Sequence, residues 1–206
     1  QDLARIDADP AAELFVPGTL VFEGKEYGTV GIRYKGSVGA FRGCLGTRGA
    51  KACTKLSMKV SFNWQLPAIE FYGLRKLQFH SMNRDPSMLK DRLGYTMFRQ
   101  FGQAAPRAVH ARLTVNGVFV GLFALVEQID GRFTRSRCAD GGQGNLYQEA
   151  WPISASKSAV TEAYLRTRLE TNADQNPTFA PMLDFSRALE AAAVSDLPDT
   201  IAKYTD

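Results

Sequence analysis

The chain lacks long apolar runs and is poor in cysteine and histidine. No segment approaches the roughly 20 consecutive apolar residues of a membrane-spanning helix, so no transmembrane segment is expected. Its three cysteines and two histidines include no Cys-x-x-Cys pair, which argues against a zinc site. The sequence also lacks the Gly-rich phosphate loops, the Gly-x-Ser-x-Gly elbow and the His-Glu-x-x-His motif. The commonest nucleotide-binding, hydrolase and zinc-protease signatures are therefore absent.

The chain also has only a small excess of positive charge. The net charge is +4, from 25 basic and 21 acidic residues among 206, and the basic residues are spread along the chain. Nucleic-acid binders concentrate their basic residues, so nucleic acid is not an expected partner. The hydrophobic content of 45% is that of a globular protein with one large or two small domains. The first residues are not a signal peptide, although a mature secreted chain would look the same after cleavage.

Two of the cysteines flank a short Gly-rich segment. Cys44 and Cys53 bracket residues 45–52, and a short loop between strands can bring such a pair within bonding distance. A disulfide here would indicate an oxidising compartment and would leave Cys138 unpaired. Two unrelated thiols fit the sequence equally well.

Alternation of apolar and polar residues predicts an antiparallel sheet in the first half of the chain. The expected strands are residues 20–22, 28–35, 55–62 and 74–80, followed by a hairpin whose turn is Asn116-Gly117. Helices are expected at 161–170, 185–194 and 196–204, and Asp184 is interpreted as a helix cap. The predicted fold class is α+β, with a sheet-rich lobe at 13–130 and the helical start of a second lobe at 131–206.

One helix is predicted between the fourth strand and the hairpin, at residues 86–101. Asp85 is placed to cap it and Pro86 suits its first turn. Apolar residues then recur every four positions from Leu89 to Phe101, and Gly102 follows where a left-handed C-cap is expected.

The strongest chemical signal is a set of cations on neighbouring strands. Period-two alternation puts Met58, Val60 and Phe62 on the buried face of their strand. Lys55, Ser57 and Lys59 then share the other face. Upstream, Arg33 and Lys35 alternate in the same way and lead into Gly36-Ser37. Such neighbours can form a basic floor for phosphate oxygens, but taken alone they fit a solvated strand face better.

Four segments in order resemble the spore-coat protein H (CotH) kinase family. Residues 33–37 resemble its basic-Gly-Ser element and residues 55–62 its lysine-bearing strand. Residues 85–93 resemble its helix start, and residues 113–127 its hairpin and hinge. The resemblance implies a divergent protein-kinase-like fold that transfers phosphate from ATP, with Mg or Mn, to serine or threonine of a protein substrate.

The resemblance also implies roles for individual residues. Lys55, and next Lys59, would pair with the nucleotide phosphates, while Lys35, Gly36 and Ser37 would lie against them. The backbone from Glu127 to Ile129 would meet the adenine edge. Asp91 would be an ion-pair partner of the strand lysine, although a solvent-facing carboxylate is the simpler interpretation. His80 and His110 are interpreted as structural histidines.

The sequence departs from the family pattern near its end. The family's catalytic and metal-binding aspartates come after the final helices, beyond Asp206, so no catalytic or metal-binding residue is assigned. We expect an N-terminal portion of a longer protein, inactive alone, from a secreted or cell-surface protein or else a spore-coat or cytoplasmic one. A non-catalytic surface or coat module of the same fold, and an extracellular domain that binds acidic polysaccharide, are the alternatives. A coat or cell-surface protein would be the substrate.

Overall fold

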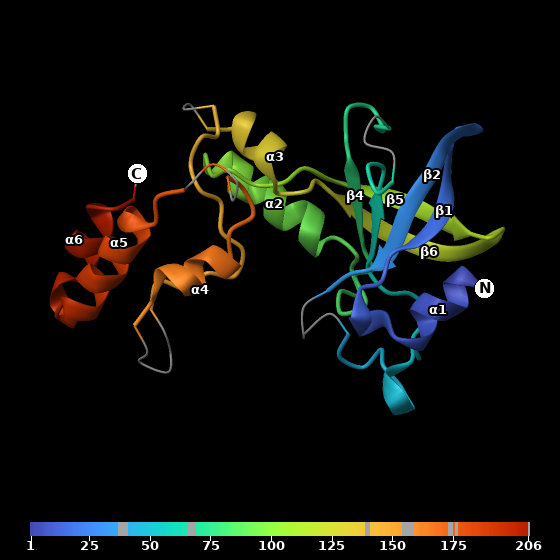
Figure 1. The fold of residues 1–206 in the computed structure, drawn as a ribbon, viewed down its shortest axis with the longest axis horizontal. Coiled ribbons are helices and arrows are strands. Elements are labelled where there is room, and N and C mark those ends of the chain that lie inside the picture. The colour runs from blue at the N-terminus through green and yellow to red at the C-terminus, as the bar shows by residue number, and fades with distance from the viewer. Residues whose placement is uncertain are drawn as a thin grey trace. The chain divides into compact units, whose positions relative to one another are not determined.

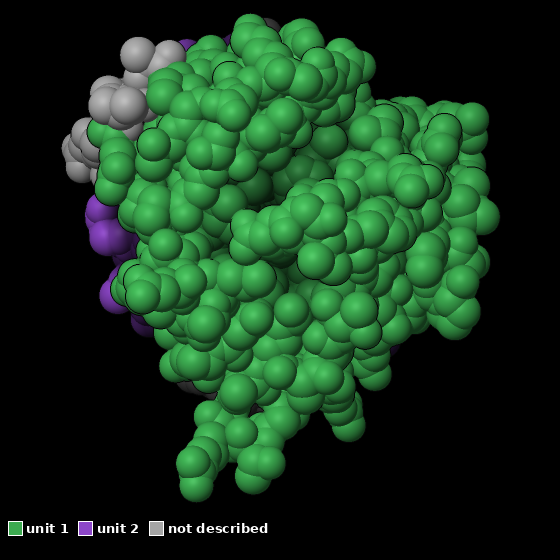
Figure 2. Space-filling model, turned by 90° about the vertical axis from the view of Figure 1, so that its right-hand side faces the viewer, with its two compact units in different colours: residues 1–128 green, residues 129–206 purple. Residues whose placement is uncertain are grey.

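A computed structural model describes residues 1–36, 41–65, 69–138, 141–153, 159–172, 175 and 177–205. The chain divides into two compact units, residues 1–128 and 129–206, which are coloured separately in Figure 2. That view also shows a hollow near the middle of the first unit's surface.

The first unit is built on a curled antiparallel sheet of six strands in the order β1-β2-β3-β4-β6-β5 (Figure 1). The strands are β1 Val16–Phe22, β2 Lys25–Tyr34, β3 Met58–Ser61, β4 Lys76–His80, β5 Ala108–Val115 and β6 Val118–Val126. The helices of this unit are α1 Asp2–Ala8 and α2 Lys90–Gln100. The predicted α+β class is confirmed.

One face of the sheet carries the hydrophobic core. Tyr34, Met58 and Phe79 are cross-strand neighbours on this face, and all three are buried. Phe123 is fully buried and packs edge-to-face on Phe79, with 6.3 Å between ring centroids. The alternation along residues 58–62 therefore predicted the buried face of β3 correctly, because side chains of successive strand residues point to opposite faces.

The β5–β6 hairpin forms as its turn sequence predicted. Asn116 and Gly117 have φ values of 49° and 80°, and Val115 pairs with Val118 across the turn. Positive φ at both central residues is the type I′ geometry, which matches the twist of the flanking strands.

Helix α2 begins four residues later than predicted. Met88 has a φ of +55°, which interrupts the helical backbone between Pro86 and Lys90. The Asp85 carboxylate spans this turn and accepts hydrogen bonds from the Ser87 and Lys90 backbone N–H groups, at 3.1 and 2.8 Å.

The end of α2 agrees with the prediction for Gly102, whose φ is +78°. Its N–H donates to Arg99 O and that of Gln103 to Phe98 O, the two bonds of a Schellman motif. The apolar residues that recur along the helix remain exposed, from Leu89 at 41% to Phe101 at 74%.

Helix α1 was not predicted from the sequence. Ile6 is 2% exposed and belongs to the core. Asp7 accepts a 2.6 Å hydrogen bond from the Tyr34 hydroxyl and forms an ion pair with Lys51. The first residues of the chain are thus part of the sheet-bearing unit.

The second unit contains α3 Gly131–Arg135, α4 Glu162–Thr167, α5 Ala180–Ala191 and α6 Leu197–Ala202. Asp130 caps α3 and Thr161 caps α4 through side-chain oxygens. The interpretation of Asp184 as a helix cap is wrong, because α5 begins at Ala180 and Asp184 lies inside it, paired with Arg187 at 3.0 Å. Pro181 explains the earlier start, since proline suits the first turn of a helix.

Candidate nucleotide-binding face

The face of the sheet opposite the core gathers polar and cationic side chains. The strand register places Arg33, Lys59 and Gln78 side by side on β2, β3 and β4. Lys35 lies two positions beyond Arg33, and its backbone N–H donates to Ser57 O. We call the residues on this face Arg33, Lys35, Lys59, Gln78 and His80, together with Asp91 of α2, the polar-face cluster.

Lys35 is held by two other residues of the cluster. Its Nζ donates to Gln78 Oε1 and lies 3.1 Å from His80 Nε2. Burial, with a smaller contribution from the neighbouring Arg33 charge, lowers the pKa of Lys35. An ammonium group has three donors and no acceptor, so these two partners leave it one further donor.

Asp91 reaches the cluster from the first turn of α2. Its Oδ2 lies 2.8 Å from His80 Nδ1, so the partner of Asp91 is a histidine that itself contacts Lys35. The Asp91 side chain is 31% exposed, and its partner is this histidine and not the strand lysine Lys55. His80 and Gln78 had no assigned role in the site, although their two-residue spacing on one strand places them on the same face.

Arg33 contacts two residues that precede β1, Glu13 and Phe15. It forms an ion pair with Glu13, and its guanidinium carbon lies 5.2 Å from the Phe15 ring centroid. Glu13 also accepts a 3.3 Å hydrogen bond from the Gly36 N–H. Glu13 thus offsets the charge of Arg33, which lies directly opposite Lys59 in the sheet; like charges in that position destabilise a strand pair.

Trp64 covers the part of this face beside Arg33. A Cβ atom on Gly31 would lie 2.5 Å from the indole Cγ, so the ring rests on the bare backbone of β2. The Trp64 ring is 6.3 Å from that of Phe15. The cluster is therefore bordered by two aromatic rings on the β2 side.

Lys55 does not join Lys59, and the expectation that the two share a face is wrong. Strand β3 begins at Met58, and the Lys55 ammonium donates to Leu122 O at 2.6 Å. Its Nζ lies 5.1 Å from the centroid of the Phe123 ring, which belongs to the core face. Burial lowers the pKa of Lys55.

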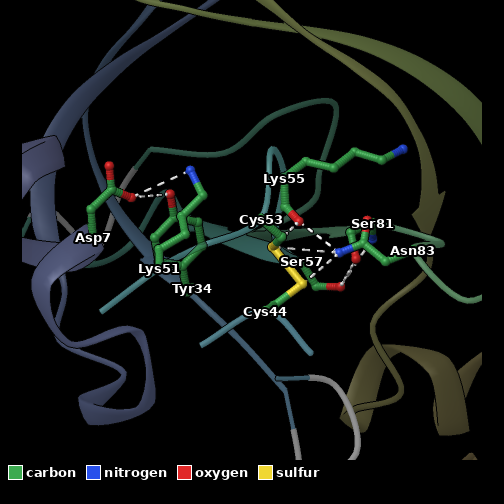
Figure 3. Close-up of a disulfide and its surroundings, with 9 residues drawn as sticks. All are labelled: Asp7, Tyr34, Cys44, Lys51, Cys53, Lys55, Ser57, Ser81 and Asn83. Carbon is green, nitrogen blue, oxygen red and sulfur yellow. Dashed lines mark hydrogen bonds and ion pairs between the residues drawn. A yellow bond between two sulfur atoms is a disulfide. The ribbon is translucent and has the colours of Figure 1, made fainter. Parts of the chain in front are cut away.

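A disulfide joins Cys44 and Cys53, whose Cα atoms are 4.7 Å apart. Figure 3 shows the Asn83 side chain beside it, with Nδ2 3.1 Å from Cys44 Sγ. The same amide nitrogen donates to Lys55 O at 2.7 Å, so Asn83 fastens the segment before β3. Cys138 is a free, exposed thiol.

Comparison with known families identifies the family of the chain. The sequence model described as "CotH kinase protein" matches residues 32–206, which is most of the chain. The chain belongs to the CotH kinase family. Among curated proteins, the inner spore coat protein H of Bacillus subtilis (strain 168) is 29% identical over 72 residues. That match covers 34% of this chain and 20% of the relative, so the similarity extends over a fifth of that relative's length.

The other residues implied by the CotH resemblance are Gly36, Ser37, Glu127 and Ile129. Gly36 directly follows Lys35 in the chain, and Ser37 lies outside the described residues. Glu127 follows β6, and its carboxylate receives a bidentate contact from Arg107, with Nη2 to Oε1 at 2.9 Å. Its backbone N–H donates to Arg107 O. Ile129 belongs to the second unit.

The family resemblance implies two cofactors, ATP and a divalent metal ion, and the described residues suit them differently. The cations of the polar-face cluster suit phosphate oxygens, which accept charge-assisted hydrogen bonds. Within the described parts of the chain, no three carboxylate, histidine or cysteine side chains are grouped so that they could hold a metal ion. Mg²⁺ is usually held by one or two carboxylates together with substrate phosphates, so a metal site made by the protein alone is not expected of these residues.

The second unit contains a separate cavity of about 460 Å³. Amide and aromatic side chains line it, including Asn145, Asn172, Tyr147 and Phe185, and the lining residues that the structure describes are uncharged. Such a lining does not favour a triphosphate. Over the described ranges, no helix is long and apolar enough to cross a bilayer.

Proposed function

We propose that the first unit binds the phosphates of ATP on the polar-face cluster, as the nucleotide-binding part of a CotH-type protein kinase. The observation that carries the proposal is the placement of Lys35 and Lys59 on one face, with Gly36 beside them. The parent protein would transfer the γ-phosphoryl group to serine or threonine of a protein substrate.

The chemistry of the cluster supports phosphate binding in particular. Phosphoryl transfer depends on positioning and on cations that stabilise the phosphate oxygens. Gln78 and His80 hold the Lys35 ammonium in place, so little side-chain entropy is lost when its remaining donor meets an oxygen. The divalent ion that the family uses would supply further positive charge to the phosphates. The role that we assign to this chain is nucleotide binding and orientation.

A second proposal is a non-catalytic module of a spore coat or cell surface. It is supported by the similarity to a protein named as an inner spore coat component. The Cys44–Cys53 disulfide also supports a location outside the reducing cytosol, because disulfides persist in oxidising compartments. This proposal predicts that ATP does not bind.

Calorimetric titration with ATP and Mn²⁺, and with ATP and Mg²⁺, tests the first proposal. We expect Lys35→Ala to weaken ATP binding about tenfold or more, because a hydrogen bond to a charged group contributes about 1.5–3 kcal/mol. Lys59→Ala is expected to act in the same direction. The matched control is Lys25→Ala, which removes a lysine from the other end of β2 and should leave the affinity unchanged.

Lys55→Ala separates the two faces of the sheet. Because the Lys55 ammonium is bonded to Leu122 O beside a core ring, we expect its removal to lower stability more than affinity. If Lys55→Ala abolishes ATP binding while Lys35→Ala does not, the assignment to the polar face is wrong. If the wild-type chain does not bind ATP with either metal, the coat-module proposal replaces the kinase proposal.

A further inference from the structure

The two histidines of the chain are held through different ring nitrogens. His80 contacts Asp91 Oδ2 through Nδ1 at 2.8 Å and Lys35 Nζ through Nε2 at 3.1 Å. His110 contacts Met88 O through Nε2 at 2.7 Å. The position of the ring proton follows from the chemistry of these partners.

For His80 the partners leave one neutral arrangement. A carboxylate only accepts hydrogen bonds and an ammonium only donates them. Nδ1 of His80 must therefore carry the proton and donate to Asp91, while Nε2 accepts from Lys35. This is the opposite of free neutral imidazole in water, which carries its proton mainly on Nε2.

For His110 the same reasoning gives the other tautomer. The Met88 carbonyl only accepts, so Nε2 carries the proton. Nδ1 lies 3.5 Å from Arg92 Nη1, which can only donate. His110 is therefore a control for the tautomer of His80. Both residues lie on the same face of one sheet, and both contact α2 or the turn before it.

We propose that His80 is a positioning residue that links Asp91 of α2 to the Lys35 ammonium through its neutral Nδ1–H tautomer. The link holds Lys35 at the candidate phosphate site and ties its place to that of α2. Its effect on nucleotide affinity rests on the proposed function, whereas the tautomer and the link do not.

Charged groups reach the surroundings of His80 from several elements. Cations reach this face from β2 (Arg33), from the residue after β2 (Lys35) and from β3 (Lys59), and Glu13 offsets Arg33. From α2 come Asp91 and Tyr95, whose pKa is raised by burial and by the Asp91 charge. His110 lies two strands away, across Ala124. A proton on Nε2 of His80 would remove the acceptor of Lys35 and place a second cation 3.1 Å from its Nζ.

Long-range ¹H–¹⁵N correlation spectra of the histidine-labelled wild-type chain, recorded at about pH 8 without nucleotide, test the link directly. Histidine charges between about pH 5 and 8, so the neutral forms are observed. We expect the Nδ1–H pattern for His80 and the Nε2–H pattern for His110, assigned with His110→Gln. An Nε2–H pattern for His80, or averaged nitrogens, overturns the proposal whether or not ATP binds.

ATP titrations at about pH 8 test the consequence for the site. We expect His80→Ala to bind ATP about tenfold more weakly than the wild type, the loss of one charge-assisted contact, whereas His110→Ala should behave like the wild type. An affinity of His80→Ala equal to that of the wild type overturns the coupling. If ATP does not bind at all, the proposed function fails, and the link is decided by the tautomer spectra.

Discussion

The Cys44–Cys53 disulfide should contribute measurably to the stability of the first unit. In the chain-entropy account, a cross-link stabilises by closing a loop in the unfolded chain. For the sequence separation of 9 residues, the loop-closure expression gives about 2.6 kcal/mol at 25 °C. Cys44 is also 5% exposed and belongs to the core, so its substitution is best made with alanine, which adds no buried polar group.

Urea unfolding followed through Trp64 fluorescence measures this contribution. Trp64 lies in the first unit and Trp151, the other tryptophan, in the second, so a Trp151→Phe background isolates the signal. We expect reduction, and separately the Cys44→Ala/Cys53→Ala double variant, to lower the free energy of unfolding by about 2.6 kcal/mol. A thiol count on the unfolded chain should give one reactive group, Cys138, before reduction.

The double variant is the control for the reductant, because the free energy of unfolding of this variant should not change when the reductant is added. A loss below about 0.5 kcal/mol on reduction would refute the loop-entropy reasoning. An equal loss in the double variant would show that the reductant acts elsewhere in the chain.

Two further predictions concern packing and pH. Phe123→Ala should lower the free energy of unfolding by about 4 kcal/mol, because the ring is fully buried against Phe79. Phe119, at 54% exposure, is the control, and Phe119→Ala should lower it by under about 1 kcal/mol. Equal losses for the two variants in urea unfolding would contradict the assignment of Phe123 to the core. Hydrogen bonds from the Ser87 side chain and from backbone N–H groups lower the pKa of Asp85, so its stabilising effect is present above the unfolded-state pKa of about 3.9 and is lost as pH falls through the lower folded value. The protection factors for hydrogen exchange in α2 should therefore fall on acidification in the wild type and much less in Asp85→Asn. An identical change of the protection factors in both would contradict the linkage.

The parts of the fold that could be predicted depend on local chemistry. Asn116-Gly117 specifies its turn through positive φ, and Gly102 ends α2 for the same reason. The buried face of β3 follows from alternation along a few residues. These signals act within a short segment, and the tertiary structure does not override them.

The errors arose where distant residues decide the local structure. The sequence predicts that Lys55 lies in a strand. In the structure the Lys55 carbonyl accepts a hydrogen bond from the Asn83 side chain, and the strand pairing begins at Met58, opposite Tyr34 at the end of β2. The link from Asp91 through His80 to Lys35 joins three elements, and no spacing in the sequence indicates such a contact. The start of α2 depends on the positive φ of Met88, a backbone conformation that methionine does not favour and that the sequence therefore does not predict.

The contact between Trp64 and Gly31 has a consequence for the history of the chain. Any residue larger than glycine at position 31 would drive a Cβ atom into the indole, so neither position can drift independently of the other. Homologues that keep a bulky aromatic ring at the position of Trp64 should keep glycine at that of Gly31. Where the ring has been replaced by a small residue, the restriction on its neighbour is lifted, and the two positions should change together during evolution.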